Sequence, residues 1–172
     1  MPSPQAIRLL VLDVDGVLTD GRLYFGPRGE ALKVFDVRDG YGLVALQRAG
    51  VAVAVISGRR SLAVRARCRE LQVRHLYQGV QDKLAVFERL RARLKLARAV
   101  CACVGDDLPD VPLMSAVALS FAVADAHPAV RRVASAVTRL GGGRGAVREV
   151  CDLLLARRSR AARPRARGRG RR

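Results

Sequence analysis

The stretch LLVLDVDGVLTDG, residues 9–21, decides the fold because it joins a buried strand to two carboxylates. Its apolar opening is typical of a strand that is covered on both faces. Asp13 and Asp15 lie two residues apart at the end of that run, and the two-residue period of a strand predicts that both side chains point the same way. Crowded carboxylates are costly unless a cation or a shared proton relieves the repulsion. The usual cation is a hard ion such as Mg²⁺, and Gly16 lets the backbone turn close to it.

The rest of the chain alternates short apolar runs with helical patterns. Strands are expected at residues 7–14, 52–57, 73–77, 99–104 and 117–122, and helices at 40–49, 60–71, 82–97, 109–115, 127–132 and 145–157. This alternation predicts an α/β fold, a Rossmann-like parallel sheet flanked by helices. Residues 21–36 interrupt it with two β-rich runs around a Gly-Pro-Arg-Gly turn, which predicts a small β-hairpin insert after the first strand.

Composition indicates one compact domain followed by a basic tail. The 172 residues are 50% hydrophobic, which is enough for one core over residues 1–156. Residues 157–172 hold nine arginines and no acid, and without them the formal net charge falls from +17 to +8. We expect this segment to be a disordered tail that binds polyanions non-specifically. No aromatic platform or nucleic-acid-binding motif accompanies it, so we expect no specific nucleic-acid partner.

The cysteines and the hydropathy indicate a cytoplasmic protein. The four cysteines show neither a CxxC pair nor zinc spacing, and we interpret them as small buried hydrophobes in a reducing compartment. No apolar run approaches the roughly 20 residues of a membrane span, and the N-terminus lacks a signal-peptide pattern.

Polar residues follow the expected strands at their carboxyl ends, where ligands bind in open sheets of this kind. Asp13 and Asp15 follow the first strand, Ser57 ends the second, Lys83 begins a helix, and the acidic loop GDDLPD occupies residues 105–110. Together they predict phosphate-monoester hydrolysis. One carboxylate serves as nucleophile, a second as acid and base, the acidic loop holds Mg²⁺, and the hydroxyl and the lysine bind phosphoryl oxygens.

Each of these residues also has a simpler interpretation when it is taken alone. Ser57 with Gly58 suits a helix cap, Lys83 suits a solvated surface, and the acidic loop suits the start of a helix. A lysine at a helix start nevertheless opposes the helix dipole, and the acids are dense for capping. Their joint occurrence at the strand ends favours a catalytic site.

Seven segments carry a resemblance to a known family; three of them are ISGR (56–59), HLYQGVQDK (75–83) and VADAHP (123–128), and the other four are the most specific. These four are DVDGVLTDG (13–21), GEALKVFDVRDGYG (29–42), GDDLPDVPLM (105–114) and GGRGAVREVCDLLL (142–155). The first and third resemble the motifs of haloacid-dehalogenase-superfamily phosphatases. The other two resemble, more closely, the 3-deoxy-D-manno-octulosonate 8-phosphate (KDO 8-P) phosphatase family, a branch without a cap domain that serves lipopolysaccharide synthesis. The resemblance covers roughly residues 7–155 and implies hydrolysis of that phosphate ester through an aspartyl-phosphate.

The resemblance implies a catalytic role for each matching residue. Asp13 is implied as the nucleophile and a Mg²⁺ ligand. Asp15 is implied as the general acid and base, with its backbone carbonyl on the metal. Asp106 completes the protein ligands, and Ser57 and Lys83 hold the phosphoryl group.

Substrate contacts are implied for a larger set. It comprises Asp15, Asp36, Val37, Arg38, Asp39, Gly40, Arg59, Arg67 and Lys83. Arg59 and Arg67 lie eight residues apart, which would place them on one face of a helix. Arginine suits the carboxylate of an acidic sugar.

The resemblance also implies a homotetramer. Hairpins corresponding to residues 21–36 assemble at its centre, and a neighbouring subunit helps to close each active site. Residues 141–144 match a flexible segment that in the family can reach into an adjacent site.

Three alternatives remain open. One is a phosphatase for a nine-carbon keto-deoxy sugar acid, although Arg59 favours the eight-carbon substrate, because the sister group tends to place Glu there. Another is a non-catalytic assembly domain, against which the intact acidic and basic residues of the rim argue. The third is an RNA-associated protein that uses the arginine tail.

Overall fold

The core of the molecule is one parallel sheet. The computed structural model describes residues 7–27 and 29–162. Six strands lie in the order β5-β4-β1-β6-β7-β8, and every adjacent pair is parallel. They are β1 (Leu9–Leu12), β4 (Ala52–Ser57), β5 (His75–Gln78), β6 (Cys101–Gly105), β7 (Leu119–Ala122) and β8 (Ala136–Val137). The predicted α/β class and Rossmann-like sheet are confirmed, and only the short, exposed β8 was not expected.

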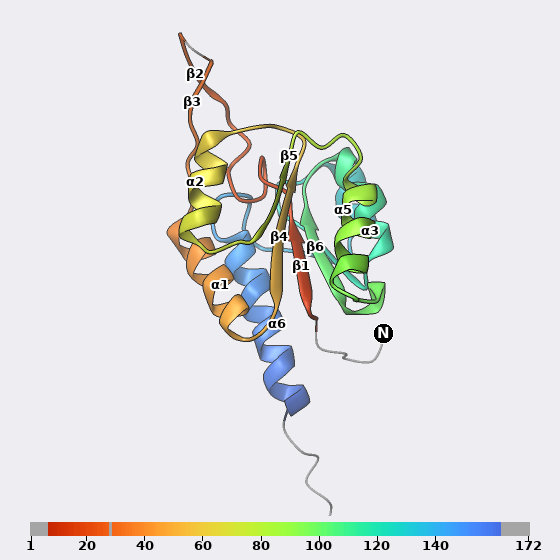
Figure 1. Cartoon of the computed structure of the whole chain (residues 1–172). Coiled ribbons are helices and arrows are strands. Elements are labelled where there is room, and N and C mark those ends of the chain that lie inside the picture. The colour runs from red at the N-terminus through yellow and green to blue at the C-terminus, as the bar shows by residue number, and fades with distance from the viewer. Residues whose placement is uncertain (1–6, 28, 163–172) are drawn as a thin grey trace, which may run out of the picture.

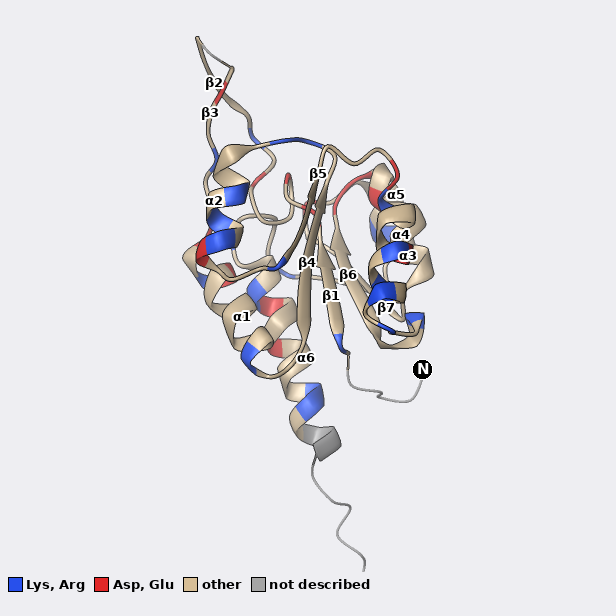
Figure 2. Cartoon of the chain, in the orientation of Figure 1, with Lys and Arg blue, Asp and Glu red and all other residues tan. Residues whose placement is uncertain are grey.

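Helices cover both faces of the sheet. They are α1 (Val37–Arg48), α2 (Leu62–Glu70), α3 (Lys83–Arg93), α4 (Val111–Ala116), α5 (Pro128–Val133) and α6 (Ala146–Ala162), with 3-10 turns at Arg98–Val100 and Leu108–Asp110. Figures 1 and 2 show α1, α2 and α6 on one side of the sheet and α3, α4 and α5 on the other, with α4 labelled in Figure 2. No cap domain interrupts the described residues, as expected.

The strands form because their residues are apolar on both faces. All four residues of β1 are buried, and Leu10 lies between Val53 of β4 and Ala102 of β6. Burial of each such side chain stabilises the fold by about 1.5–3 kcal/mol relative to exposure. The four cysteines are buried and unpaired, which confirms their interpretation as core residues.

The predicted hairpin is present as β2 (Tyr24–Gly26) and β3 (Gly29–Leu32), paired antiparallel. It projects beyond the end of the sheet at which β1 and β4 finish (Figure 1). Phe25 is 66% exposed and Leu32 48% exposed. The hairpin therefore presents apolar side chains outside the core.

Three helix boundaries differ from the expected ones by three residues or more. α1 begins at Val37 because the Asp36 carboxylate caps it by accepting the Arg38 N–H at 2.7 Å. α3 ends at Arg93, four residues early, since Lys95 takes a positive φ of 54°.

α6 continues to Ala162, past residue 157, where the tail was expected to begin. The helix runs toward the opposite end of the sheet from the hairpin (Figure 1). The rest of the expected tail, 163–172, lies outside the described residues. No helix within the described ranges is long and apolar enough to cross a membrane.

Candidate active site

Asp13 and Lys83 meet at the carboxyl ends of the strands. Asp13 directly follows β1, and Lys83 is the first residue of α3, which Asp82 caps by accepting the Ala85 N–H at 2.9 Å. The Lys83 Nζ lies 2.8 Å from the Asp13 Oδ1 and 2.7 Å from the Asp110 Oδ1, and only 8% of the side chain is exposed. Lys83 is therefore not a solvated surface lysine: it neutralises two buried carboxylates.

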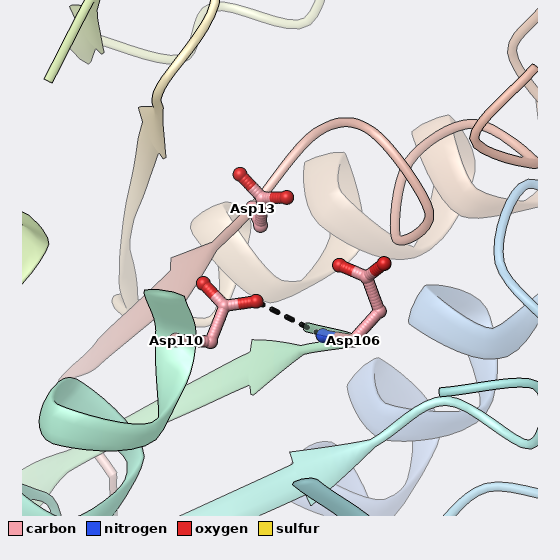
Figure 3. A group of neighbouring side chains, drawn as sticks. All are labelled: Asp13, Asp106 and Asp110. Atoms are coloured by element: carbon pink, nitrogen blue, oxygen red, sulfur yellow. Dashed lines mark hydrogen bonds between the residues drawn. The ribbon is translucent and has the colours of Figure 1, made fainter. Parts of the chain in front are cut away.

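Two aspartates of the acidic loop after β6 make different hydrogen bonds. Asp107 caps the 3-10 turn Leu108–Asp110, which agrees with the simpler interpretation for that residue alone. Asp110 instead turns back, and its Oδ2 accepts the Asp106 N–H at 3.0 Å (Figure 3). This bond shapes the loop so that the Asp106 side chain faces Asp13.

Asp13, Asp106 and Asp110 form an acidic cluster, with one oxygen from each lying within 4.8 Å of the others (Figure 3). Burial raises the pKa of Asp13 to about 6 against the pull of Lys83, and burial with the charges of Asp13 and Asp110 raises the pKa of Asp106 to about 8. Burial alone would lower the pKa of Lys83, but the charges of Asp13 and Asp110 hold that pKa above its ordinary value. One lysine thus leaves negative charge uncompensated in the cluster.

The cluster fits a divalent cation. The Asp106 Oδ1 is buried and has no hydrogen-bond partner among the described residues. A carbon added at Gly16, whose φ is +93°, would lie 2.0 Å from the Asp106 Oδ2, so only glycine leaves room for this carboxylate. Carboxylate oxygens are the ligands that Mg²⁺ prefers, and a buried unpartnered oxygen beside two further carboxylates suits such an ion.

Asp15 faces other partners than Asp13. β1 ends at Leu12, so the two-residue strand period, on which the prediction of a common side-chain direction was based, does not extend to Asp15. The Asp15 Oδ1 contacts the Lys33 Nζ, and its Oδ2 lies 4.0 Å from the Arg59 Nε. The chain thereby keeps one carboxylate in the acidic cluster and the other at the rim.

Ser57 ends β4 and is buried. Its Oγ accepts the Arg59 N–H at 3.2 Å, while the cap residue of α2 is Ser61. The interpretation of Ser57 as a helix cap is therefore wrong. Arg59 lies in the loop before α2, so helical spacing does not place it on one face with Arg67.

The segment 36–40 and Arg67 lie together at the start of α1, outside the acidic cluster. Asp39 is buried, and its Oδ1 accepts the Arg148 N–H from α6 at 2.7 Å. Arg67 pairs with Glu70 at 2.8 Å, and its guanidinium leaves no room for a side chain at Gly40. Val37 and Arg38 are exposed.

The glycine-rich segment 141–145 packs on its own chain. The Gly142 N–H donates to the Asp125 Oδ1 and the Gly143 N–H to the Val17 carbonyl, both at 2.9 Å. A carbon added at Gly142 would lie 1.7 Å from the Gly16 carbonyl oxygen. These glycines permit close approach to the loop after β1, a role that the flexible interpretation of the segment missed.

Two rim residues, Glu30 and Lys33, were not among the expected site residues. Both come from the hairpin, which the sequence presented only as an insert. Their charges at i and i+3 were visible, but nothing in the pattern indicated that they reach back to Asp15 and Arg59.

Comparison with known proteins agrees with this geometry. Residues 76–142 match a family model described as haloacid dehalogenase-like hydrolase. The chain is 54% identical over 155 residues to 3-deoxy-D-manno-octulosonate 8-phosphate phosphatase KdsC of Escherichia coli strain B, covering 90% of this chain and 82% of that protein.

Solved structures agree as well. The Yersinia pestis phosphatase of the same name superimposes with a TM-score of 0.88 at 51% identity, covering 91% of this chain and 84% of that one. The Moraxella catarrhalis enzyme, in complex with magnesium ion, phosphate ion and a KDO molecule, gives a TM-score of 0.87 at 39% identity, covering 90% and 88%. The chain therefore belongs to the 3-deoxy-D-manno-octulosonate 8-phosphate phosphatase family of haloacid-dehalogenase-like hydrolases.

Proposed function

We propose that this chain is a Mg²⁺-dependent phosphatase that hydrolyses KDO 8-P to the free sugar acid and phosphate, in lipopolysaccharide biosynthesis. The observation that carries the proposal is the position of Lys83, buried between Asp13 and Asp110 beside an unpartnered Asp106. This arrangement lies in a chain that is 54% identical to a named KDO 8-P phosphatase.

The reaction proceeds in two halves. An Asp13 carboxylate oxygen attacks phosphorus, the bond from phosphorus to the sugar oxygen breaks, and Asp15 protonates the departing alkoxide. Asp15, now a carboxylate, then takes a proton from water, whose oxygen attacks the aspartyl-phosphate and releases inorganic phosphate. Asp13 is restored with both oxygens, so the enzyme returns to its starting state.

The residues around Asp13 bind the phosphoryl group and the metal. Ser57 and Lys83 donate to phosphoryl oxygens, Lys83 as a fixed cation. Asp13, Asp106 and the Asp15 backbone carbonyl hold Mg²⁺, and Asp110 fixes the loop and Lys83. The ion, when bound, offsets the repulsion between the carboxylates and the phosphate dianion.

The sugar acid is recognised at the rim. Arg59 has a side chain that is 43% exposed beside Asp15, and we assign it to the substrate carboxylate. Arg67 and residues 36–40 complete the contacts in the assembled enzyme. A nine-carbon keto-deoxy sugar acid phosphate is the alternative substrate, and Arg59 favours the eight-carbon one.

We further propose a cytoplasmic homotetramer. The exposed apolar side chains of the hairpin, among them Phe25, support assembly through that element, and a neighbouring subunit would supply the cover that a cap domain gives elsewhere. Four unpaired cysteines suit a reducing compartment. The basic end of α6 and the arginines that follow it bind polyanions non-specifically. Light scattering tests the tetramer.

The decisive experiment measures phosphate release from KDO 8-P against a panel of sugar phosphates that includes the nine-carbon one. It is run with Mg²⁺ and with a chelator, and Asp13→Asn is the control. A Mg²⁺-dependent preference for KDO 8-P that the variant lacks supports the proposal. Preference for another ester reassigns the substrate, and no release from any ester favours the non-catalytic assembly domain.

A further inference from the structure

Lys33 is a buried cation at the foot of an otherwise exposed hairpin. Only 1% of its side chain is exposed, although it follows β3 directly. Its Nζ contacts the Asp15 Oδ1 and lies 3.2 Å from the Glu30 Oε2. Burying a lysine costs desolvation and side-chain entropy, so it persists where paired carboxylates compensate it.

Glu30 extends these contacts to a second loop. Its Oε2 also accepts a hydrogen bond from the Arg59 Nη2 at 3.2 Å, and the Arg59 Nε lies 4.0 Å from the Asp15 Oδ2. We call Asp15, Glu30, Lys33 and Arg59 the rim network. It joins the loop after β1, the hairpin and the loop after β4, and it brings two carboxyl groups together with two cations.

The residues of the rim network differ in how far their side chains are exposed to solvent. The Arg59 side chain is 43% exposed, so its remaining N–H groups are open to a ligand. Lys33 is closed to solvent and touches the reacting groups only through Asp15. Glu30 uses one oxygen for both cations, and its side chain is 15% exposed.

We propose that Lys33 and Glu30 are positioning residues, through which the hairpin sets the placement of the proton donor Asp15 and of the substrate-binding Arg59. This inference rests on the proposed phosphatase function. Lys33 holds the Asp15 carboxyl near the position of the leaving oxygen, and Glu30 holds the Arg59 guanidinium at the rim.

A purely structural hairpin pair would have different contacts. Glu30 and Lys33 stand at i and i+3 and could pair with each other at the surface, where such pairs contribute little. Instead each also reaches a charged residue on another loop. Loss of either one leaves an opposite charge uncompensated beside a catalytic group.

The test compares two phosphate esters in the full-length enzyme with Mg²⁺. KDO 8-P has an alkoxide leaving group that needs a proton, whereas the phenolate of p-nitrophenyl phosphate leaves without one. The kcat/KM of each ester reports the first phosphoryl transfer. Asp15→Asn sets the benchmark for loss of the proton donor.

Lys33→Met is expected to lower kcat/KM for KDO 8-P by about 100-fold, the scale of an angstrom-level misplacement. For the aryl ester the loss stays below about 3-fold, since that step does not depend on the donor. Lys33→Arg recovers part of the loss because it keeps the charge. Lys95→Met, at an exposed lysine after α3, leaves both values unchanged.

Glu30→Gln is expected to raise KM for KDO 8-P by about 10-fold with little change in kcat, since it frees Arg59. The KM of the aryl ester, which has no carboxylate, stays the same. Glu88→Gln is the matched control, because Glu88 of α3 also pairs with two arginines, Arg91 of the same helix and Arg98 of the 3-10 turn that follows it.

Equal losses on both esters, with the Lys33→Arg variant no better than Lys33→Met, overturn the inference while the phosphatase function stands. Thermal unfolding of each variant is measured beside the kinetics, and the ester ratio within one variant is independent of how much of it is folded. A wild-type chain that releases phosphate from neither ester refutes the proposed function and this inference with it.

Discussion

Replacement of Lys83 by methionine tests the electrostatic centre of the site. Methionine keeps the length and the apolar stem of the side chain but removes the charge. The Lys83 Nζ lies within 2.8 Å of carboxylate oxygens from two aspartates, and the side chain is 8% exposed. Removing one member of a buried ion pair costs about 3–5 kcal/mol, because the partner's charge stays buried without compensation.

Chemical denaturation in the presence of a chelator measures this cost. We expect the free energy of unfolding of Lys83→Met to fall by about 3–5 kcal/mol relative to wild type, whereas Lys95→Met changes by less than about 0.5 kcal/mol. Mg²⁺ should then restore more stability to the variant than to wild type, since the cation supplies part of the missing charge and stabilises by mass action.

Phosphate release provides the second readout. Lys83→Met should lose nearly all activity even at Mg²⁺ concentrations that restore its stability, because the phosphoryl group lacks its fixed cation. A loss of stability below about 1 kcal/mol would refute the reasoning, since it would mean that the three carboxylates are solvated rather than buried.

Two further substitutions test separate features. Gly16→Ala should weaken Mg²⁺ binding in calorimetry and lower phosphate release by about 100-fold, because the added carbon displaces Asp106. The control is Gly29→Ala, at a similar positive φ with open space around it, which should cost backbone strain alone. Burial raises the pKa of Asp39 from 3.8 to about 6, although the hydrogen bond from the Arg148 N–H acts to lower it. The free energy of unfolding of the wild type should therefore fall relative to that of Asp39→Asn as the pH rises from 3.8 to about 6, by about 3 kcal/mol in all. Urea titrations at pH 3.5 to 7 check this, and parallel stability curves would contradict it.

The sheet was predictable because buried strands have a distinctive composition. Strands that are apolar on both faces exclude most alternatives, and polar residues at their carboxyl ends then predict a shared site. The acidic cluster followed from that rule, since Asp13 and Asp106 end adjacent strands.

The other features of the fold and of the site depend on contacts between distant parts of the chain, which local sequence patterns do not indicate. Gly40 and Gly42 are poor helix formers within α1, yet they allow Arg67 and Arg148 to lie close against it. Tertiary packing therefore overrides a weak helical propensity there. The contacts of Glu30 and Lys33 with the β1 and β4 loops likewise depend on how the hairpin folds back.

The glycine-rich segment 141–145 shows how the same residues support opposite interpretations. Glycines in sequence indicate flexibility, and a flexible segment could leave its own site for that of a neighbour. Here Gly142 and Gly143 each donate a backbone hydrogen bond, and withdrawal of the segment would break both, at about 1 kcal/mol apiece. It would also uncover the Gly16 carbonyl, against which Gly142 packs too closely for any other residue. Because Gly16 stands beside Asp15, the segment supports the loop after β1 of its own chain. Its exchange with a neighbouring chain would therefore disturb the site that the segment leaves as well as the site that it enters.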